Sequence, residues 1–173
     1  MATATHIPIE QYLKTEYEPD AEYVDGAIEE RNLGEYDHNA VQKAILLWFA
    51  RHEKEWGIRC IQEQRTRLGP RHVRIPDVSL FARSLPVEQV FTRPQLVSIE
   101  VLSPEDRHSK AQEKIDEYRA FKIQGIWVID PVKRIGWDCS DGNWTRKDRF
   151  ELAGTPIRLD MQELFSELDA AEA

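Results

Sequence analysis

Two acidic residues stand in segments that otherwise have the composition of buried β-strands. Asp77 lies in Arg74-Ile-Pro-Asp-Val-Ser-Leu-Phe81, and Glu100 lies in Leu96-Val-Ser-Ile-Glu-Val-Leu102. A buried ionised carboxylate is costly unless a cation or hydrogen-bond donors compensate its charge. Two such carboxylates suggest one shared divalent cation, and oxygen ligands without a cluster of His or Cys favour Mg²⁺ or Mn²⁺ over Zn²⁺. The residue types therefore indicate metal-dependent hydrolysis.

The alternation of side chains in the two segments sharpens this interpretation. Residues two apart on a strand share a face, so Asp77 and Glu100 each lie on a mixed face, while the opposite faces are wholly apolar. Those opposite faces comprise Val78, Leu80, Ala82, Val97, Ile99 and Val101. If the two strands are neighbours with their mixed faces aligned, the carboxylates converge. The alternative is that each acid caps a strand end or pairs with an arginine, which is the commoner outcome for a single acid.

A helix that should pack on the sheet follows the second strand. Between residues 106 and 124 the apolar side chains fall at helical spacing, at Ala111, Ile115, Tyr118 and Phe121. Lys114 lies within or beside this apolar stripe, one turn before Tyr118. Its side chain either extends outward to solvent along its aliphatic stem or directs its ammonium at a buried negative site. The two strand carboxylates make both outcomes plausible.

The order of several short motifs resembles a known family. The motifs are Glu22-Tyr-Val-Asp-Gly26, a helix opening at His38, Pro76-Asp77, Glu100-Val-Leu-Ser-Pro104, Lys114-Ile-Asp-Glu-Tyr118 and Gly125-Ile-Trp-Val-Ile-Asp-Pro131. Together they are similar to the Uma2 family of restriction-endonuclease-like proteins in the PD-(D/E)XK nuclease superfamily. The resemblance covers roughly residues 20 to 137. It implies a nuclease fold and hydrolysis of phosphodiester bonds, with DNA as the expected substrate.

The resemblance also implies roles for particular residues. Asp77 and Glu100 match the acids that hold the divalent cation, and the backbone carbonyl of Val101 is implied as a further ligand. The chain departs from the superfamily at Leu102, where a lysine usually stands. Lys114 is the natural candidate to replace that lysine, and Lys110, one turn earlier, is its competitor.

Three supporting residues carry weaker expectations. Glu22 precedes an Asp25-Gly26 turn signal, so it is either a solvated hairpin residue or a third acid of the site. His38 is expected to cap or pack its helix rather than act as a base. Tyr118 is expected in the core, with a hydroxyl able to bind Lys114 or a phosphate.

The overall charge argues against nucleic-acid binding. The chain has 31 acidic and 23 basic residues, a net charge of −8, whereas such proteins usually carry a basic footprint. A local cluster before the Asp77 strand could still meet phosphates, or could be a solvated loop. It comprises Arg65, Arg67, Arg71, His72 and Arg74.

Length and composition predict a single domain over residues 1–173. The two cysteines form no Cys-x-x-Cys pair, and no signal peptide or membrane-length apolar run is present, so we expect a reducing cytoplasm and no membrane partner. A two-fold homodimer is compatible with the family and with the aromatic-rich C-terminal hairpin.

The expected fold class is α/β, a restriction-endonuclease-like mixed β-sheet flanked by α-helices, with an N-terminal and a C-terminal antiparallel hairpin. The elements expected in chain order are a hairpin at 22–31, a helix at 37–56, strands at 58–65 and 73–82, the Glu100 strand, the Lys114 helix, a strand at 126–130, a second hairpin around Trp137 and Trp144, and a helix at 161–168. The expected function is a magnesium-dependent endonuclease. The alternative is a catalytically silent module that keeps the fold to bind nucleic acid or protein.

Overall fold

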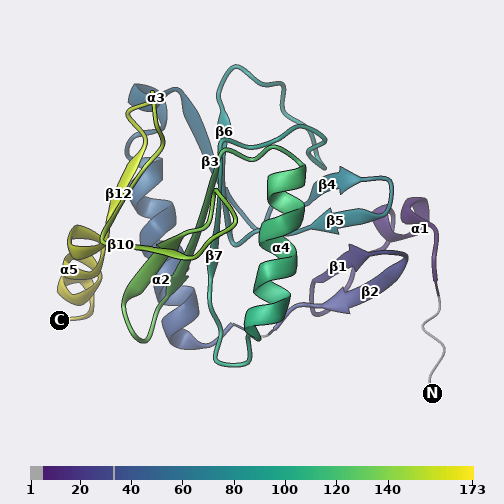
Figure 1. Ribbon diagram of the computed structural model, residues 1–173, viewed down its shortest axis with the longest axis horizontal. Helices are drawn as coiled ribbons and strands as arrows, with labels where there is room; N and C mark the ends of the chain where they lie inside the picture. The colour runs from purple at the N-terminus through teal and green to yellow at the C-terminus, as the bar shows by residue number, and fades with distance from the viewer. Residues whose placement is uncertain (1–5, 33) are drawn as a thin grey trace.

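A mixed six-stranded sheet forms the centre of the computed structural model, which describes residues 6–32 and 34–173 (Figure 1). Its order is β10-β9-β8-β7-β6-β3. The strands are β3 (Ile58–Gln62), β6 (Val78–Ala82), β7 (Val97–Val101), β8 (Gly125–Asp130), β9 (Ile135–Asp138) and β10 (Thr145–Lys147). Strands β7 and β8 are parallel, joined through a helix, and the other pairs are antiparallel. The parallel pair is the strand-helix-strand unit that the sequence predicts.

A smaller antiparallel sheet lies beside the central one, with the order β2-β1-β5-β4. Its strands are β1 (Ala21–Val24), β2 (Ala27–Glu30), β4 (Thr66–Gly69) and β5 (His72–Arg74). A further pair, β11 (Arg149–Glu151) and β12 (Arg158–Asp160), follows the C-terminal hairpin. The mixed sheet and both hairpins agree with the expected fold class.

Helices cover both faces of the central sheet (Figure 1). They are α1 (Ile9–Leu13), α2 (Tyr36–Ala50), α3 (Glu53–Trp56), α4 (His108–Ala120) and α5 (Met161–Glu172). The larger core contains side chains of α2, α5 and the apolar faces of β6 and β7, with Val78, Leu80, Val97 and Ile99 fully buried. A smaller core packs α4 against β8. Alternation along β7 therefore leaves Glu100 on the α4 side, as expected. Among the described residues, no helix combines the length and apolar composition needed to span a bilayer.

The predicted strand at 73–82 is two strands in different sheets. The strand is interrupted at Pro76, which has no N–H to donate to a neighbouring strand and which restricts the backbone conformation of Ile75. Strand β5 therefore ends in the smaller sheet and β6 begins in the larger one. Asp77 lies in the short link between them, immediately before β6.

The predicted helix at 37–56 is also divided. Helix α2 ends at Ala50, and the N–H of His52 then donates to the carbonyl of Phe49, a tight bond that ends the regular ladder. The short α3 follows and stops at Gly57, which adopts a left-handed conformation with φ of 65°. The end of the helical segment at residue 56 was predicted, and the break within it was not.

Candidate active site

The link between the two sheets places Asp77 beside Glu100. Val78 pairs with Ile99 in the antiparallel β6–β7 ladder, so the residues immediately before and after this pair are neighbours. The N–H of Val101 donates to Asp77 Oδ2 at 2.8 Å, which fixes the carboxylate against β7. Both acids line one cleft. The two acids line the same cleft, as expected, but Asp77 lies in the link before β6 and not on the mixed face of a strand.

Asp77 is buried and has cationic partners. Arg31 Nη2 donates to Oδ1 at 2.7 Å, and His38 Nε2 lies 3.3 Å from Oδ2. Gln42 donates to the backbone carbonyl at 3.0 Å. Burial alone would raise the pKa of Asp77, but His38, Arg31 and Lys114 outweigh it and lower the pKa below its ordinary value. Asp77 is therefore ionised at neutral pH.

Glu100 has a different balance of charges. Tyr118 donates its hydroxyl proton to Oε1, and Lys114 Nζ lies 3.4 Å from Oε2. Burial raises the pKa of Glu100 to about 7, with Lys114 opposing the rise and Asp77 adding to it. Two neighbouring carboxylates thus have pKa values displaced in opposite directions, a pattern that is enriched at functional sites.

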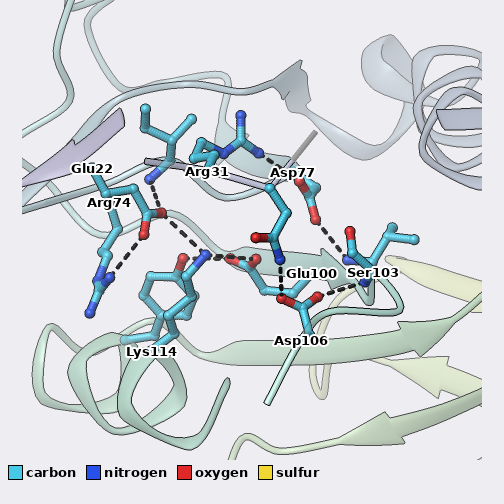
Figure 2. A network of polar contacts seen from close by, with 12 residues as sticks. Glu22, Arg31, Arg74, Asp77, Glu100, Ser103, Asp106 and Lys114 are labelled. Atoms are coloured by element: carbon cyan, nitrogen blue, oxygen red, sulfur yellow. Dashed lines mark hydrogen bonds and ion pairs between the residues drawn. The ribbon is translucent and has the colours of Figure 1, made fainter. Parts of the chain in front are cut away.

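A third acid, Glu22 of β1, joins the group from the smaller sheet (Figure 2). Its Oε1 accepts from the N–H of Ile75 at 2.9 Å and lies 3.2 Å from Lys114 Nζ. Lys114 therefore sits between Glu22 and Glu100, and of the two alternatives its ammonium takes the one directed at the acids. Burial lowers the pKa of Lys114, but Glu100, Glu22 and Asp77 raise it well above its ordinary value. Lys114 is a permanent cation here.

The phosphate-contact prediction for Arg74 is wrong. Its side chain is 2% exposed, and it donates to both carboxylate oxygens of Glu117 at 2.7 Å and to Glu22 at 2.8 Å. Three carboxylates, those of Glu22, Glu29 and Glu117, surround a guanidinium that solvent barely reaches. Arg74 orients Glu22 from behind instead of meeting a ligand.

The cleft in front of the acids has a volume of about 140 Å³. Its walls carry Asp77, Glu100, Val101, Glu22 and His38, together with both Lys110 and Lys114. Lys110 is exposed on the first turn of α4 and has no ion pair among the described contacts. The arginines at 65, 67 and 71 do not line the cleft, and Arg71 contacts Asp25 at the tip of the smaller sheet.

The donor set suits a divalent cation that keeps much of its hydration. Within residues 6–32 and 34–173, no three His, Cys, Asp or Glu side chains converge as a metal-binding group. Asp77 and Glu100 offer carboxylate oxygens, and each oxygen can accept more than one contact. Mg²⁺ is commonly held by one or two carboxylates with water completing its shell, whereas structural Zn²⁺ takes four protein ligands. The two carboxylates therefore suit a hydrated cation of the Mg²⁺ type better than they suit Zn²⁺.

A model of the family described as "putative restriction endonuclease", Uma2, matches residues 9–158 of the chain. The chain belongs to the Uma2 family. The match spans both sheets and every residue of the candidate site, and it extends the resemblance noted in the sequence toward both ends. No curated protein matches the chain.

The solved structures that are similar to this Uma2 chain include the following two. A protein of Anabaena variabilis, described as a putative nuclease belonging to DUF820, superposes with a TM-score of 0.74 at 24% identity, over 94% of this chain and 99% of the other. That likeness shows a shared fold. A DrdV–DNA complex has a TM-score of 0.46 at 15% identity and covers 77% of this chain but 11% of the other. The second likeness is too slight to carry an argument.

Arg31, Gln42 and Glu63 contact Asp77, but sequence reasoning did not single them out. Arg31 Nη1 lies 3.4 Å from Glu63 Oε1, and the N–H of Glu63 donates to the Asp77 carbonyl. Arg31 is separated from Asp77 by 46 positions, and its local sequence carries no signal of the contact. His38 and Tyr118 do lie in the site, each bound to one of the acids, and not only in packing roles.

Proposed function

We propose that this protein is a divalent-cation-dependent nuclease that hydrolyses phosphodiester bonds in DNA. The observation that carries the proposal is the convergence of Asp77, Glu100 and the Lys114 ammonium at one cleft, from the link before β6, from β7 and from α4. Membership of the Uma2 family supports the reaction class. The residue roles given next are part of the proposal.

Each side chain has a distinct task in this scheme. A cation bound by Asp77, Glu100 and the Val101 carbonyl would activate water and neutralise phosphoryl charge. The Val101 N–H and His38 hold Asp77 in its ionised form, and Tyr118 orients Glu100 by donating to one of its oxygens. Glu22 holds the Lys114 ammonium in place.

Lys114 takes the role of the missing motif lysine at Leu102. A cation with its pKa raised does not accept a proton, so Lys114 stabilises negative charge on the phosphoryl oxygens or orients water by donating to it. Lys110 lines the same cleft from the first turn of α4 and is exposed, so we assign it a minor contribution to phosphate attraction. Arg65, Arg67 and Arg71 remain proposed contacts for more distant phosphates.

One observation favours a catalytically silent module as the second candidate. The three acids already have cationic partners within the chain, Arg31, Arg74 and Lys114. With the net charge of −8, this internal neutralisation is compatible with a scaffold that has no cation and binds a protein or nucleic acid.

The homodimer also remains a proposal, tested by sedimentation velocity.

The deciding experiment combines binding with turnover. Supercoiled plasmid and linear duplex DNA are incubated with the protein and Mg²⁺, Mn²⁺ or chelator, and melting is recorded under the same conditions. We expect cation-dependent nicking, and stabilisation by about 2.7 kcal/mol at a hundredfold excess of cation over its dissociation constant. Asp77→Ala should remove both effects.

Lys110→Ala is the matched control, since it alters the same cleft without touching an acid of the proposed cation site. Equal melting temperatures with Mg²⁺, Mn²⁺ and chelator, together with no cleavage, would favour the silent module. Cleavage that persists in Asp77→Ala at the wild-type rate would point to a contaminating nuclease.

A further inference from the structure

Arg31 holds the oxygen of Asp77 that faces away from the sheet. The other oxygen, Oδ2, accepts from the Val101 N–H at 2.8 Å and lies 3.3 Å from His38. Oδ1 accepts from Arg31 Nη2 at 2.7 Å. Oδ2 is thus held by the backbone of β7 as well as by His38, whereas the partner of Oδ1 among the described contacts is the Arg31 side chain on the cleft wall.

This arrangement sets Arg31 against any cation bound by Asp77. A guanidinium and a divalent ion that share one carboxylate oxygen lie within a few ångströms of each other, and their repulsion is strong in a partly buried site. Arg31 is anchored by its backbone, whose N–H donates to the Asp20 carbonyl at 3.0 Å. Its side-chain contact with Glu63, at 3.4 Å, is long and half open to solvent, with the Glu63 side chain 42% exposed.

The guanidinium has a second use within the same cleft. Among the lining residues that the structure describes, Arg31 carries the only guanidinium, and the other cations are lysines. The planar fork of an arginine binds two phosphate oxygens at once, whereas a lysine supplies a point charge. Arg31 can change partners by side-chain rotation alone because its backbone is fixed at the end of β2.

We propose that Arg31 is a phosphate-contacting residue whose availability is coupled to cation binding. In this structure Arg31 neutralises Asp77; with a cation bound to that carboxylate, the guanidinium would be free to turn to a phosphate of the substrate. The inference rests on the proposed nuclease function. It differs from a purely structural ion pair because it requires Arg31 to oppose cation binding and yet to assist turnover.

The test measures these two effects separately. Ca²⁺ binding without DNA is followed by calorimetry, and Mg²⁺-dependent cleavage is followed in single turnover, for wild type, Arg31→Ala and Arg31→Lys. We expect Arg31→Ala to bind Ca²⁺ about tenfold more tightly and to cleave about a hundredfold more slowly. Arg31→Lys keeps the charge and loses the fork, so it should bind Ca²⁺ as wild type does and still cleave slowly.

The matched control is Arg134→Ala, which removes an arginine that donates two hydrogen bonds to Asp169, far from the cleft lining. It should change neither measurement. If Arg31→Ala fails to fold, Arg31→Lys decides the proposal through its cleavage rate. Unchanged Ca²⁺ affinity in a folded Arg31→Ala overturns the coupling while the nuclease proposal stands. If no variant binds Ca²⁺ and wild type shows no cation-dependent cleavage, both proposals fail together.

Discussion

Two arginines of this chain make the same fork-shaped contacts in opposite surroundings. Arg74 binds Glu117 with two hydrogen bonds of 2.7 Å in the junction between the sheets, where its side chain is 2% exposed. Arg134 binds Asp169 with two hydrogen bonds, of 2.8 and 2.6 Å, on the surface beside α5, where the side chains are 46% and 55% exposed. The geometry of the two pairs is nearly equal, but their surroundings differ. Arg74 is buried among three carboxylates, whereas Arg134 is at the surface with its guanidinium over the Phe165 ring.

The contrast shows what the buried network is for. Desolvating charges costs several kcal/mol per ion, which close pairing only roughly repays, whereas an exposed pair costs little and contributes little. A network that runs from Arg74 through Glu22 and Lys114 to Glu100 is therefore a poor way to gain stability. It does fix the orientation of Glu22 and hence of the Lys114 ammonium.

The largest expected effect on stability comes from removing the buried charge of Arg74. Arg74→Met keeps most of the side-chain volume and removes the charge, which leaves Glu22 and Glu117 short of a partner. We expect the free energy of unfolding to fall by about 3–5 kcal/mol, measured by urea denaturation. A loss below about 1 kcal/mol would mean that protons or water compensate the two carboxylates, and that the Arg74 charge is not needed for the stability of the fold.

The next effect concerns turnover. Lys114→Ala should lower single-turnover cleavage by about a hundred- to a thousandfold, because the ammonium beside Glu22 and Glu100 is lost. Cation binding should survive. Lys110→Ala should be much milder, and the reverse ranking of the two variants would make Lys110 the residue that stabilises the transition state.

The pH dependence separates Glu100 from the other acids. Burial raises the pKa of Glu100 to about 7, and the charges of Asp77 and Glu22 add to the rise. Lys114 and the Tyr118 hydroxyl oppose it. A ligand must lose its proton, so Mg²⁺ affinity should fall about tenfold for each pH unit below 7. Calorimetry between about pH 5.5 and about pH 8 checks this dependence. An affinity that does not change over this range would show that Glu100 is not a ligand.

The same raised pKa has a stability consequence of opposite sign. Without cation, folded Glu100 holds its proton more tightly than the unfolded chain does. Its contribution to stability is therefore present below the ordinary glutamate pKa of 4.5 and is lost as pH rises through about 7. The pKa of His38 is also raised, because its contact with Asp77 outweighs burial, and this raised pKa acts in the same direction. Glu100→Gln removes the Glu100 part, and melting curves of both proteins isolate it.

The smallest effect belongs to the surface pair. Arg134→Met matches Arg74→Met in chemistry and should change the free energy of unfolding by less than about 1 kcal/mol. Added salt should reduce even that difference, because exposed pairs are screened. A cost as large as that of Arg74→Met would remove the contrast between the two settings.

Local pattern predicted the parts of the fold that depend on periodicity. Alternation in residues 96–102 placed Glu100 opposite an apolar core face, and helical spacing placed Tyr118 toward the sheet. The same spacing left two directions open for Lys114, and the contact with Glu100 decides between them. The switch of sheets at Pro76 was missed because the apolar composition continues across it. The strands β11 and β12 were missed because each is three residues long and half polar.

The residues of the candidate site that lie in sequence motifs could be predicted. Those that reach the site only through contacts distant in sequence could not. Asp77, Glu100 and Lys114 were found in this way. Arg74 was assigned to the surface because neighbouring arginines suggested a basic loop, but strand alternation turns it inward to Glu22. Arg31 was missed because its partner is 46 positions away.

The placement of the acids across two sheets has a dynamic consequence. Native proteins open in cooperative units, and units that share few contacts open independently. Glu22 belongs to the smaller sheet and Glu100 to the larger one, so a local opening of β1 would release the Lys114 anchor while leaving Glu100 in its strand. The amide protons of Ile75 and Val101 donate to Glu22 and Asp77 respectively. The exchange rate of the Ile75 amide would therefore report on opening of the smaller sheet, and that of the Val101 amide on opening of the larger one. Equal rates would indicate that the two sheets open together.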